Sequence, residues 1–340
     1  MENYCIILED KIYSQRAPNS KFIEFTLDNI KTKTYEDLPN EIIEIIKLNE
    51  DLQQNPSKYL KYKFIKNGVE IVEIKTDEVP FIKIPEFIDG SPVIKLGSRI
   101  TNFNDLKIKQ IQLPDTIKEF SEATFENSNV EYINAPKKLT IIPSLCFKYS
   151  KIKTFDCSNI EKIENQGFAN CSQLVKIDLP KVKKIGSEAF VYCKKLNEVN
   201  LSNYITEIPP YAFYGAKKLK KIKLPKNINK VCVYGFYNSG LEEIEFNDKL
   251  TEIKGKSFQF TKLKRIKLPE ELLTIEEGAF FCCEDLEEII TNNKLKLIKK
   301  EAFSDTKIKN IYLSNDIIYE KDSFPSDTHI IINKEEAIDR

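Results

Sequence analysis

A phenylalanine recurs along most of this 340-residue chain at intervals of 21 to 23 residues, and this spacing constrains the fold more than any other feature. The recurring residues are Phe103, Phe125, Phe147, Phe168, Phe190, Phe213, Phe236, Phe258, Phe280, Phe303 and Phe324. A fixed period of about 20 to 50 residues is typical of repeat architectures, in which each repeat packs only on its neighbours. The sequence therefore predicts a solenoid.

Other positions keep a fixed place relative to each phenylalanine. An aliphatic residue usually stands five positions before it, and small residues stand directly before it and three positions after it, as Ile185, Ala189 and Cys193 do around Phe190. Apolar residues at i, i+1 and i+4 suit one helical turn. A cysteine in these columns is expected to behave as a small buried hydrophobe.

Each repeat closes with a segment similar to Ile-x-Leu-Pro. Ile222, Lys223 and Leu224 alternate between apolar and polar, which is strand periodicity, and Pro225 ends the strand. Stacked repeats would place such strands about 4.8 Å apart in a parallel sheet on one face. The crossover between parallel strands in one sheet is almost always right-handed.

The full frame, Ile-x-x-Ile-x-x-x-Ala-Phe-x-x-Cys-x-x-Leu-x-x-Ile-x-Leu-Pro, resembles the BspA-type leucine-rich repeat. Residues 163–180 and 185–196 show the frame, and residues 84–93 resemble the usual first repeat of that family. The resemblance covers about residues 60–330. We therefore expect an α/β fold, a right-handed leucine-rich-repeat solenoid of about ten to eleven repeats of 22 residues. The resemblance also implies a binding protein, often on a cell surface, without catalytic residues.

The two ends of the chain depart from the repeat. We expect an N-terminal cap or small α+β module at residues 1–58, the solenoid at 59–330 and a C-terminal tail at 331–340. Within the first segment, residues 4–8 and 22–26 look like strands and residues 41–52 like a helix. A cap is the simpler reading because repeat arrays need one, and a partner-binding module is the alternative. Residues 329–334 look like a last edge strand.

The sequence offers little that resembles a catalytic or metal site. His329 is the single histidine, and Cys282 and Cys283 lie two repeats away from it. The phosphate-binding and nucleophile motifs with characteristic glycine spacing are absent from the sequence. We therefore predict a protein that is not an enzyme and has no catalytic, cofactor-binding or metal-binding residues.

Two cysteines share one column of adjacent repeats. Stacking would bring Cys171 and Cys193 within about 5 Å, a separation that also suits a disulfide. A reduced, packed pair is the preferred reading for a cytosolic chain.

Charge and hydropathy limit the partners and the location. The 52 basic residues cancel the 52 acidic ones, which argues against nucleic acid as a partner. The sequence shows no apolar stretch long enough for a membrane span and no signal peptide at its start. As written the chain reads as cytoplasmic, although the family that it resembles is often secreted, so the location stays open. We expect a monomer.

The outward positions of the strands form the expected binding surface, the concave sheet face. In the second half they alternate in sign from repeat to repeat, as in Lys221 and Lys223 against Glu243 and Glu245. Opposite charges on neighbouring strands stabilise register, so a self-neutralised ladder is the first reading and a ligand site the second. The candidate binding residues on this face are Tyr132, Lys221, Lys223, Arg265, Lys267, Ile290 and Tyr312.

Aromatic residues also follow the recurring phenylalanine by one or two positions. They are Tyr149, Tyr192, Tyr214, Tyr237, Phe260 and Phe281. Packing between repeats is the preferred reading of this set, and a second interaction surface is the alternative because aromatic residues are enriched in interface cores.

Taken together, these patterns predict a non-enzymatic scaffold for protein–protein interaction, in the form of a surface or adhesin-type binding protein. The alternative is an intracellular adaptor, because residues 38–43 resemble the opening of an F-box, a helical ubiquitin-ligase adaptor often joined to leucine-rich repeats.

Overall fold

The computed structural model describes residues 4–8, 11–15, 22–26, 29–33, 37–76, 79–101 and 107–333. Phe103 lies outside these residues, as do residues 334–340 of the expected tail. The chain divides into two compact units. Unit 1 comprises residues 1–139 and 150–155, and unit 2 comprises residues 140–149 and 156–340. The division between cap and solenoid at residue 58 stays a prediction.

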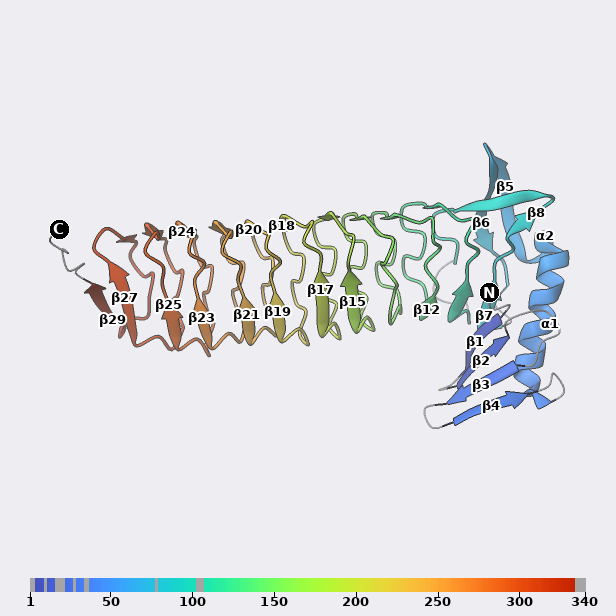
Figure 1. Ribbon diagram of the computed structural model, residues 1–340, viewed down its shortest axis with the longest axis horizontal. Helices are drawn as coiled ribbons and strands as arrows, with labels where there is room; N and C mark the ends of the chain where they lie inside the picture. Colours follow the sequence, from blue (N-terminus) through green and yellow to red (C-terminus); the bar gives the residue numbers. More distant parts are fainter. Residues whose placement is uncertain are drawn as a thin grey trace. The chain divides into compact units, whose positions relative to one another are not determined.

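Unit 1 contains the helices, a meander and the first coils of the solenoid. The meander has the order β1-β2-β3-β4, and β1 and β3 coincide with the strands expected at residues 4–8 and 22–26 (Figure 1). The elements of unit 1 are β1 (Tyr4–Leu8), β2 (Lys11–Gln15), β3 (Phe22–Thr26), β4 (Asn29–Lys33), α1 (Asn40–Gln54), α2 (Pro56–Tyr59), β5 (Leu60–Ile65), β6 (Gly68–Ile74), β7 (Phe81–Lys83), β8 (Phe87–Ile88), β9 (Ser91–Leu96), β10 (Gln110–Gln112), β11 (Glu119–Phe120) and β12 (Tyr132–Ile133).

Helix α1 covers the edge of β7, which pairs with β10 on its other side. The side-chain amide of Asn49 donates to the Phe81 carbonyl at 3.1 Å and accepts from the Lys83 N–H at 2.6 Å. Gln53 donates to the Lys83 carbonyl at 2.9 Å. These amides take the place of a further strand, because the edge groups of a buried sheet need hydrogen-bond partners.

Helix α1 buries its apolar side chains within unit 1. Leu38, Ile42, Ile45 and Ile46 are all buried, and the chain enters strand β5 five residues after Asn55. In an adaptor of the F-box type such a helix belongs to a helical domain, whereas here a short turn of helix leads directly into a β-hairpin. The arrangement of residues 37–76 therefore does not favour the adaptor reading.

Unit 2 is a stack of coils of about 22 residues, with one strand of each coil on each of two faces (Figure 1). The first face holds the strands predicted from the Ile-x-Leu segments: β15 (Lys176–Leu179), β17 (Glu198–Leu201), β19 (Lys221–Lys223), β21 (Glu243–Glu245), β23 (Arg265–Lys267), β25 (Glu288–Ile290), β27 (Asn310–Ser314) and β29 (His329–Asn333). Its paired strands are parallel and in register, as between Ile222 of β19 and Ile244 of β21.

A second set of parallel strands runs along the opposite side of the coils, in one three-stranded and one six-stranded sheet. Its strands are β13 (Ile141–Ile142), β14 (Lys162–Ile163), β16 (Lys184–Ile185), β18 (Glu207–Ile208), β20 (Lys230–Val231), β22 (Glu252–Ile253), β24 (Thr274–Ile275), β26 (Leu297–Ile298) and β28 (Ile318–Tyr319). The sequence predicted a parallel sheet on one face, and the strands of this opposite face were not predicted. In most of these strands the aliphatic residue five positions before the phenylalanine points inward and its polar neighbour points outward, as Ile185 and Lys184 do, which is strand alternation over only two residues.

The phenylalanine column forms the centre of unit 2. We use this name for Phe147, Phe168, Phe190, Phe213, Phe236, Phe258, Phe280, Phe303 and Phe324. Successive rings are nearly parallel, with interplanar angles of 2–12° and centroids 5.1–5.6 Å apart. All but the last are fully buried, so the eight-ring interior confirms the core expected from the spacing.

The segment around each phenylalanine is a series of tight turns, and the expected helical turn is wrong. Glu188 and Tyr192, two positions to either side of Phe190, have φ values of 59° and 54°. The N–H groups of Glu188, Phe190 and Tyr192 donate to carbonyls of the next coil at 2.7–3.0 Å. In an α-helix these N–H groups would point along the helix axis, so the ladder between coils excludes it. The α/β class is therefore not confirmed, and the handedness of the coil stays a prediction.

Candidate protein-binding surface

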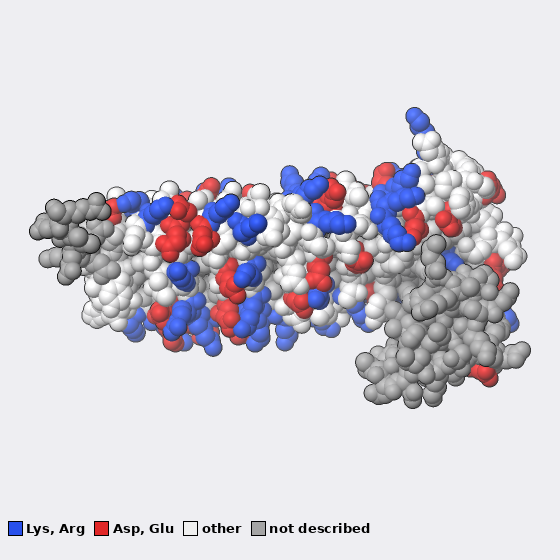
Figure 2. Space-filling model, in the orientation of Figure 1, with Lys and Arg blue, Asp and Glu red and all other residues white. Residues whose placement is uncertain are grey.

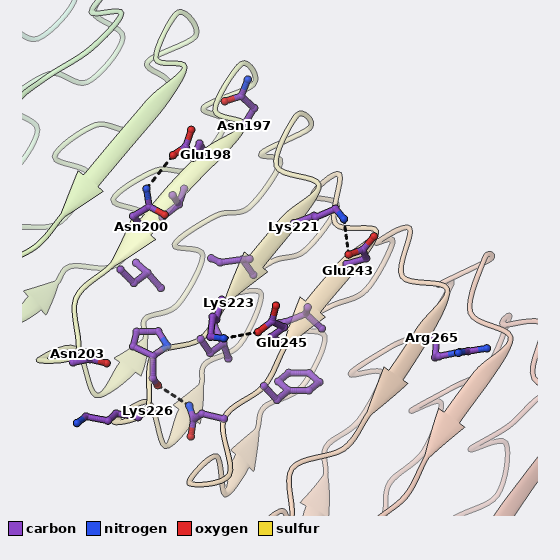
Figure 3. A pocket seen from close by; sticks show the side chains of 18 residues that line it. Asn197, Glu198, Asn200, Asn203, Lys221, Lys223, Lys226, Glu243, Glu245 and Arg265 are labelled. Atoms are coloured by element: carbon purple, nitrogen blue, oxygen red, sulfur yellow. Dashed lines mark hydrogen bonds and ion pairs between the residues drawn. The ribbon is translucent and has the colours of Figure 1, made fainter.

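Three of the predicted binding residues belong to a ladder of charges on the first face of unit 2. Lys221 and Lys223 of β19 form ion pairs of 2.7 Å with Glu243 and Glu245 of β21, as the dashed lines in Figure 3 show. Arg265 of β23 pairs with Glu288 of β25 at 2.7 Å. We call these six residues the charge ladder. Strand register places each partner directly opposite, because Lys221 aligns with Glu243 and Arg265 with Glu288.

The alternation of sign extends over whole coils and beyond the strands. Lys220 pairs with Glu242 at 2.8 Å in the position just before the ladder. Figure 2 shows blue and red patches side by side along the lower margin of the solenoid, where Figure 1 draws β19, β21 and β23. Lys220 and each positive charge of the charge ladder thus have a negative neighbour within the protein. The ladder offers an acidic or basic partner little net charge, and its ion pairs are exposed, so each one contributes little stability.

The outward column that contains Lys267 becomes apolar toward the C-terminal end. Lys267 lies opposite Ile290 in register, and its nearest carboxylate is that of Glu270 at 3.6 Å. Ile290, Tyr312 and Ile331 then follow on β25, β27 and β29, with 45%, 53% and 37% of their surfaces exposed. Tyr312 aligns with Ile331, and the Thr291 hydroxyl donates to the Tyr312 carbonyl at 2.8 Å, which joins the three strands. We call these three residues the apolar stripe.

A groove of about 880 Å³ lies on the first face between β17 and β23 (Figure 3). Val199, Ile222 and Leu224 form part of its apolar floor, and all three are buried side chains of the interior. The residues of the charge ladder on β19 and β21, together with Asn200, form its walls. A groove with an apolar floor and polar walls is the usual form of a site that binds another molecule.

Tyr132 belongs to unit 1, whereas the other six candidates belong to unit 2. The Lys153 ammonium lies 4.9 Å from the centre of its ring and 3.2 Å from its hydroxyl. Lys153 also pairs with Glu131 at 2.6 Å, and this hydrogen bond, with that to Tyr132, raises the pKa of Lys153. The Tyr132 ring is therefore held in place by a cation–π contact within its own unit.

The aromatic residues of the turns form a packed ladder of their own. Tyr214 stacks on Tyr237 with centroids 4.7 Å apart, and Tyr192 and Phe260 contact its ends edge-on. Sequence reasoning missed Tyr211 and Tyr234, which stack at 4.8 Å two positions before the phenylalanine column. Their common place in the repeat was the signal that would have revealed them. These contacts support the reading of packing between coils.

The cysteines of the turns pack as small hydrophobic residues. The thiols of Cys171 and Cys193 donate to the carbonyls of Phe147 and Phe168 at 3.0 and 3.1 Å, and both cysteines are buried. Burial raises the pKa of Cys193 and raises that of Cys283 to about 12. Such thiols are poor nucleophiles, because the thiolate is disfavoured in apolar surroundings.

His329 lies on exposed strand β29, in register with Asn310. In the part of the chain that the structure describes, the histidine, cysteine and acidic residues form no group of three or more that suits a metal ion. Among the same residues, no helix has the length and apolar character needed to cross a membrane.

A family model of the BspA-type leucine-rich repeat region matches residues 99–220 and 206–330, with six copies of the repeat. The chain belongs to this family. Its solenoid fold is typical of non-enzymatic scaffolds. A comparison with curated protein sequences finds no match to this BspA-type chain.

Several solved structures of bacterial leucine-rich repeat proteins are similar to it. A leucine-rich repeat protein from Bacteroides ovatus has a TM-score of 0.63 and 23% identity, over 81% of this chain and 89% of that one. The pneumococcal vaccine antigen PcpA has a TM-score of 0.48 and 20% identity, over 82% and 80%. A leucine-rich cell surface protein from Faecalibacterium prausnitzii has a TM-score of 0.44 and 19% identity, over 82% and 94%. At 23% identity, the similarity to the Bacteroides ovatus protein shows the fold alone.

Proposed function

We propose that this BspA-type protein is a non-enzymatic scaffold that binds a partner protein through the first face of its solenoid. The observation that carries the proposal is the apolar stripe beside the charge ladder. Ile290, Tyr312 and Ile331 are exposed on three neighbouring strands, whereas the ladder residues neutralise one another. Exposed apolar and aromatic side chains that adjoin a polar rim are typical of protein interfaces.

The stripe and the groove have different parts in this proposal. Tyr312 is the expected anchor, because a tyrosine supplies a large apolar surface together with a hydroxyl that finds a partner at the edge of the interface. The groove between β17 and β23 would receive a side chain of the partner on its apolar floor. The paired Lys221, Lys223 and Arg265 would then lie at the rim, where charges affect the rate of association more than the affinity.

A photo-crosslinking experiment tests this proposal. A photoreactive phenylalanine analogue replaces Tyr312 in one variant and Tyr149 in another, since the two tyrosines are similarly exposed, at 53% and 50%. Tyr149 lies in a turn away from the first face. We expect a crosslinked protein from position 312 alone, and direct binding of that purified protein should be weakened at least tenfold by Tyr312→Lys. Equal crosslinking from both positions, or unchanged binding by the lysine variant, would contradict the proposal.

An exported, adhesin-type role is a finer proposal, and it rests on what the family implies. Localisation of the native protein tests it. Detection of the intact protein on the cell surface, in cells whose membranes remain closed to antibody, is the expected result. Signal that requires permeabilised cells would contradict the surface role and leave the scaffold role intact.

We also propose that residues 1–58 act as the cap of the solenoid that spans residues 59–330. The contacts of Asn49 and Gln53 with the edge of β7 support this proposal. Asn49→Leu should lower the melting temperature, because it leaves the Lys83 N–H and the Phe81 carbonyl with one partner fewer in a buried site. A melting temperature equal to that of the unmodified protein would contradict it.

A further inference from the structure

The C-terminal end of the solenoid exposes residues that earlier coils bury. Ile330 and Ile332 of β29 align with Ile311 and Leu313 of β27, which are fully buried, yet Ile332 is 45% exposed. Phe324 stacks on Phe303 at 5.6 Å and contacts Tyr319 edge-on at 6.0 Å. Tyr319 of β28 is 44% exposed, whereas Ile298, at the same place in the preceding coil, is fully buried. Within the described part of the chain, no further coil covers this end, so it is a surface that a partner would fit.

The backbone of β29 presents hydrogen-bonding groups at the same end. The His329 N–H donates to the Lys309 carbonyl in the chain segment that leads into β27. Successive residues of a strand point their N–H and C=O groups to opposite sides, so those of Ile330 and Ile332 point away from β27. Among the residues that the structure describes, β27 is the only strand that pairs with β29. Such an edge is a template for a further strand.

We propose that this open end binds the open end of a second copy of the chain. In the resulting two-fold dimer, the two β29 strands pair antiparallel about Ile331. A two-fold axis can pair any edge strand with its own copy, and in β29, His-Ile-Ile-Ile-Asn, this pairing brings three isoleucines together without placing like charges opposite each other. In this register Ile330 of each copy lies opposite Ile332 of the other. Both residues carry the outward N–H and C=O groups, so both pairs exchange two hydrogen bonds.

Side chains fit this register as well as the backbone does. Ile330 and Ile332 share the inward columns of Ile311 and Leu313, so pairing extends the core of one copy into the core of the other. Ile331 points outward with Tyr312, so the apolar stripes of the two copies would form one continuous strip on the joined first faces. Sequence considerations favoured a monomer. The dimer goes beyond the scaffold function proposed above and does not depend on the identity of a partner protein.

Sedimentation equilibrium of the purified full chain, without any partner, measures this association. We expect a mass twice that of one chain, and Ile332→Pro should reduce it to that of one chain. Proline at this position removes an N–H that points to the second copy and none that bonds to β27, so the fold should tolerate it at an edge. A melting curve of the variant confirms that it remains folded.

A matched pair of lysine variants separates the open end from general surface hydrophobicity. Ile332 and Ile141 are equally exposed, at 45% and 44%, and Ile141 lies on the second face at the other end of unit 2. Ile332→Lys should weaken dimerisation at least tenfold, because it places two charges in the junction. Ile141→Lys should leave the mass at twice that of one chain.

A cysteine variant tests the register itself. Two-fold pairing places Ile331 opposite its own copy in a pair without hydrogen bonds, where Cα atoms are about 4.5 Å apart, within the range of a disulfide. Ile331→Cys should therefore give a covalent dimer on mild oxidation, and Tyr312→Cys, one strand away, should not.

Several outcomes would overturn the proposal. A mass of one chain at all accessible concentrations would do so. If the chain then dimerised once residues 334–340 were removed, that segment would be the occupant of the open end. A dimer that survives both Ile332 variants would place the interface elsewhere. A covalent dimer from Tyr312→Cys and not from Ile331→Cys would refute the register.

Discussion

The phenylalanine column inside the solenoid and the charge ladder on its first face repeat with the same period, but they follow different rules. Inside, every coil carries the same residue, and the rings stack 5.1–5.6 Å apart. Outside, Lys221 and Lys223 in one coil face Glu243 and Glu245 in the next. Identical apolar rings attract each other in a column, whereas identical charges on neighbouring strands repel.

This difference shows which part of the repeat fixes the fold. A buried ring loses packing on all sides when it is truncated, and the surrounding coils cannot close around the gap. An exposed ion pair exchanges its partner for water at little cost. The column should therefore determine stability, and the ladder should adjust the register of the strands. The predictions that follow test this contrast in order of decreasing effect.

The largest effect is expected in the column. Phe190→Ala or Phe236→Ala should reduce the free energy of unfolding by about 3–5 kcal/mol, because each removes a fully buried ring and leaves a cavity between two others. Denaturant titration with far-UV circular dichroism measures the change. If the loss of unfolding free energy were no larger than for a substitution at an exposed position, the distinction between the phenylalanine column and the charge ladder would not hold.

Two adjacent cysteines show the same contrast between a buried and an exposed position. Cys283 is fully buried, and Cys282 is partly exposed beside Asp305, with burial and that carboxylate raising its pKa to about 11. Cys282 should react with a thiol reagent at least tenfold faster than Cys283, Cys171 and Cys193, which require opening of the coil. Mass spectrometry of the labelled peptides measures the rates.

All eight cysteines should react after denaturation without a reductant. Four thiols fewer in the denatured chain would indicate native disulfides and would contradict the reduced, packed arrangement of Cys171 and Cys193.

Glu164 is partly exposed, between the buried column and the exposed ladder. Its ionisation makes the stability of the protein depend on pH. Glu164 accepts hydrogen bonds from Lys162 at 2.6 Å and from the Ser144 N–H at 3.2 Å, and the contact with Lys162 lowers its pKa. The charged form then contributes stability above the ordinary pKa of 4.5, and this contribution is lost as the pH falls through the lowered value.

Glu164→Gln should therefore lower the melting temperature near neutral pH and make the decrease on acidification less steep. Melting curves from about pH 6 to about pH 3 measure both slopes. Parallel slopes for the two proteins would show that Glu164 has no such role.

The smallest effect is expected at a single outward position. Lys223→Ala should change the free energy of unfolding by no more than about 0.5 kcal/mol, because surface substitutions away from buried contacts usually do. The neighbouring Ile222 is buried, so Ile222→Ala serves as the comparison and should cost several times more. Similar losses at both positions would place Lys223 in a contact that the ladder does not include.

The column and the first-face strands were predictable because they depend on periodicity. A phenylalanine every 21 to 23 residues and an alternating Ile-x-Leu segment are visible without coordinates, and so is the sign change between Lys223 and Glu245. Of the candidate binding residues, Lys221, Lys223 and Arg265 each form an ion pair with a glutamate of the charge ladder. Ile290 and Tyr312 are neighbours in the apolar stripe.

The turns, the strands of the second face and the contact between helix α1 and β7 were not predictable, for physical reasons. Glu188 and Tyr192 adopt positive φ values although side chains at such positions are strained, and only the hydrogen bonds to the next coil compensate. Strands of two residues, such as Lys184–Ile185, are too short for alternation to be recognised. The contact of Asn49 with β7 joins residues more than thirty positions apart, which no local pattern encodes.

Charge reversal tests the division between column and ladder most directly. Reversing Glu243 and Glu245 to Lys places like charges against Lys221 and Lys223, so the melting temperature should fall at low salt and less at high salt. Reversing their partners Lys221 and Lys223 to Glu in the same chain should restore much of the loss. A compensated variant that regains no stability at low salt, while the first reversal alone abolishes binding of the partner protein, would contradict the account and assign these residues to the binding site.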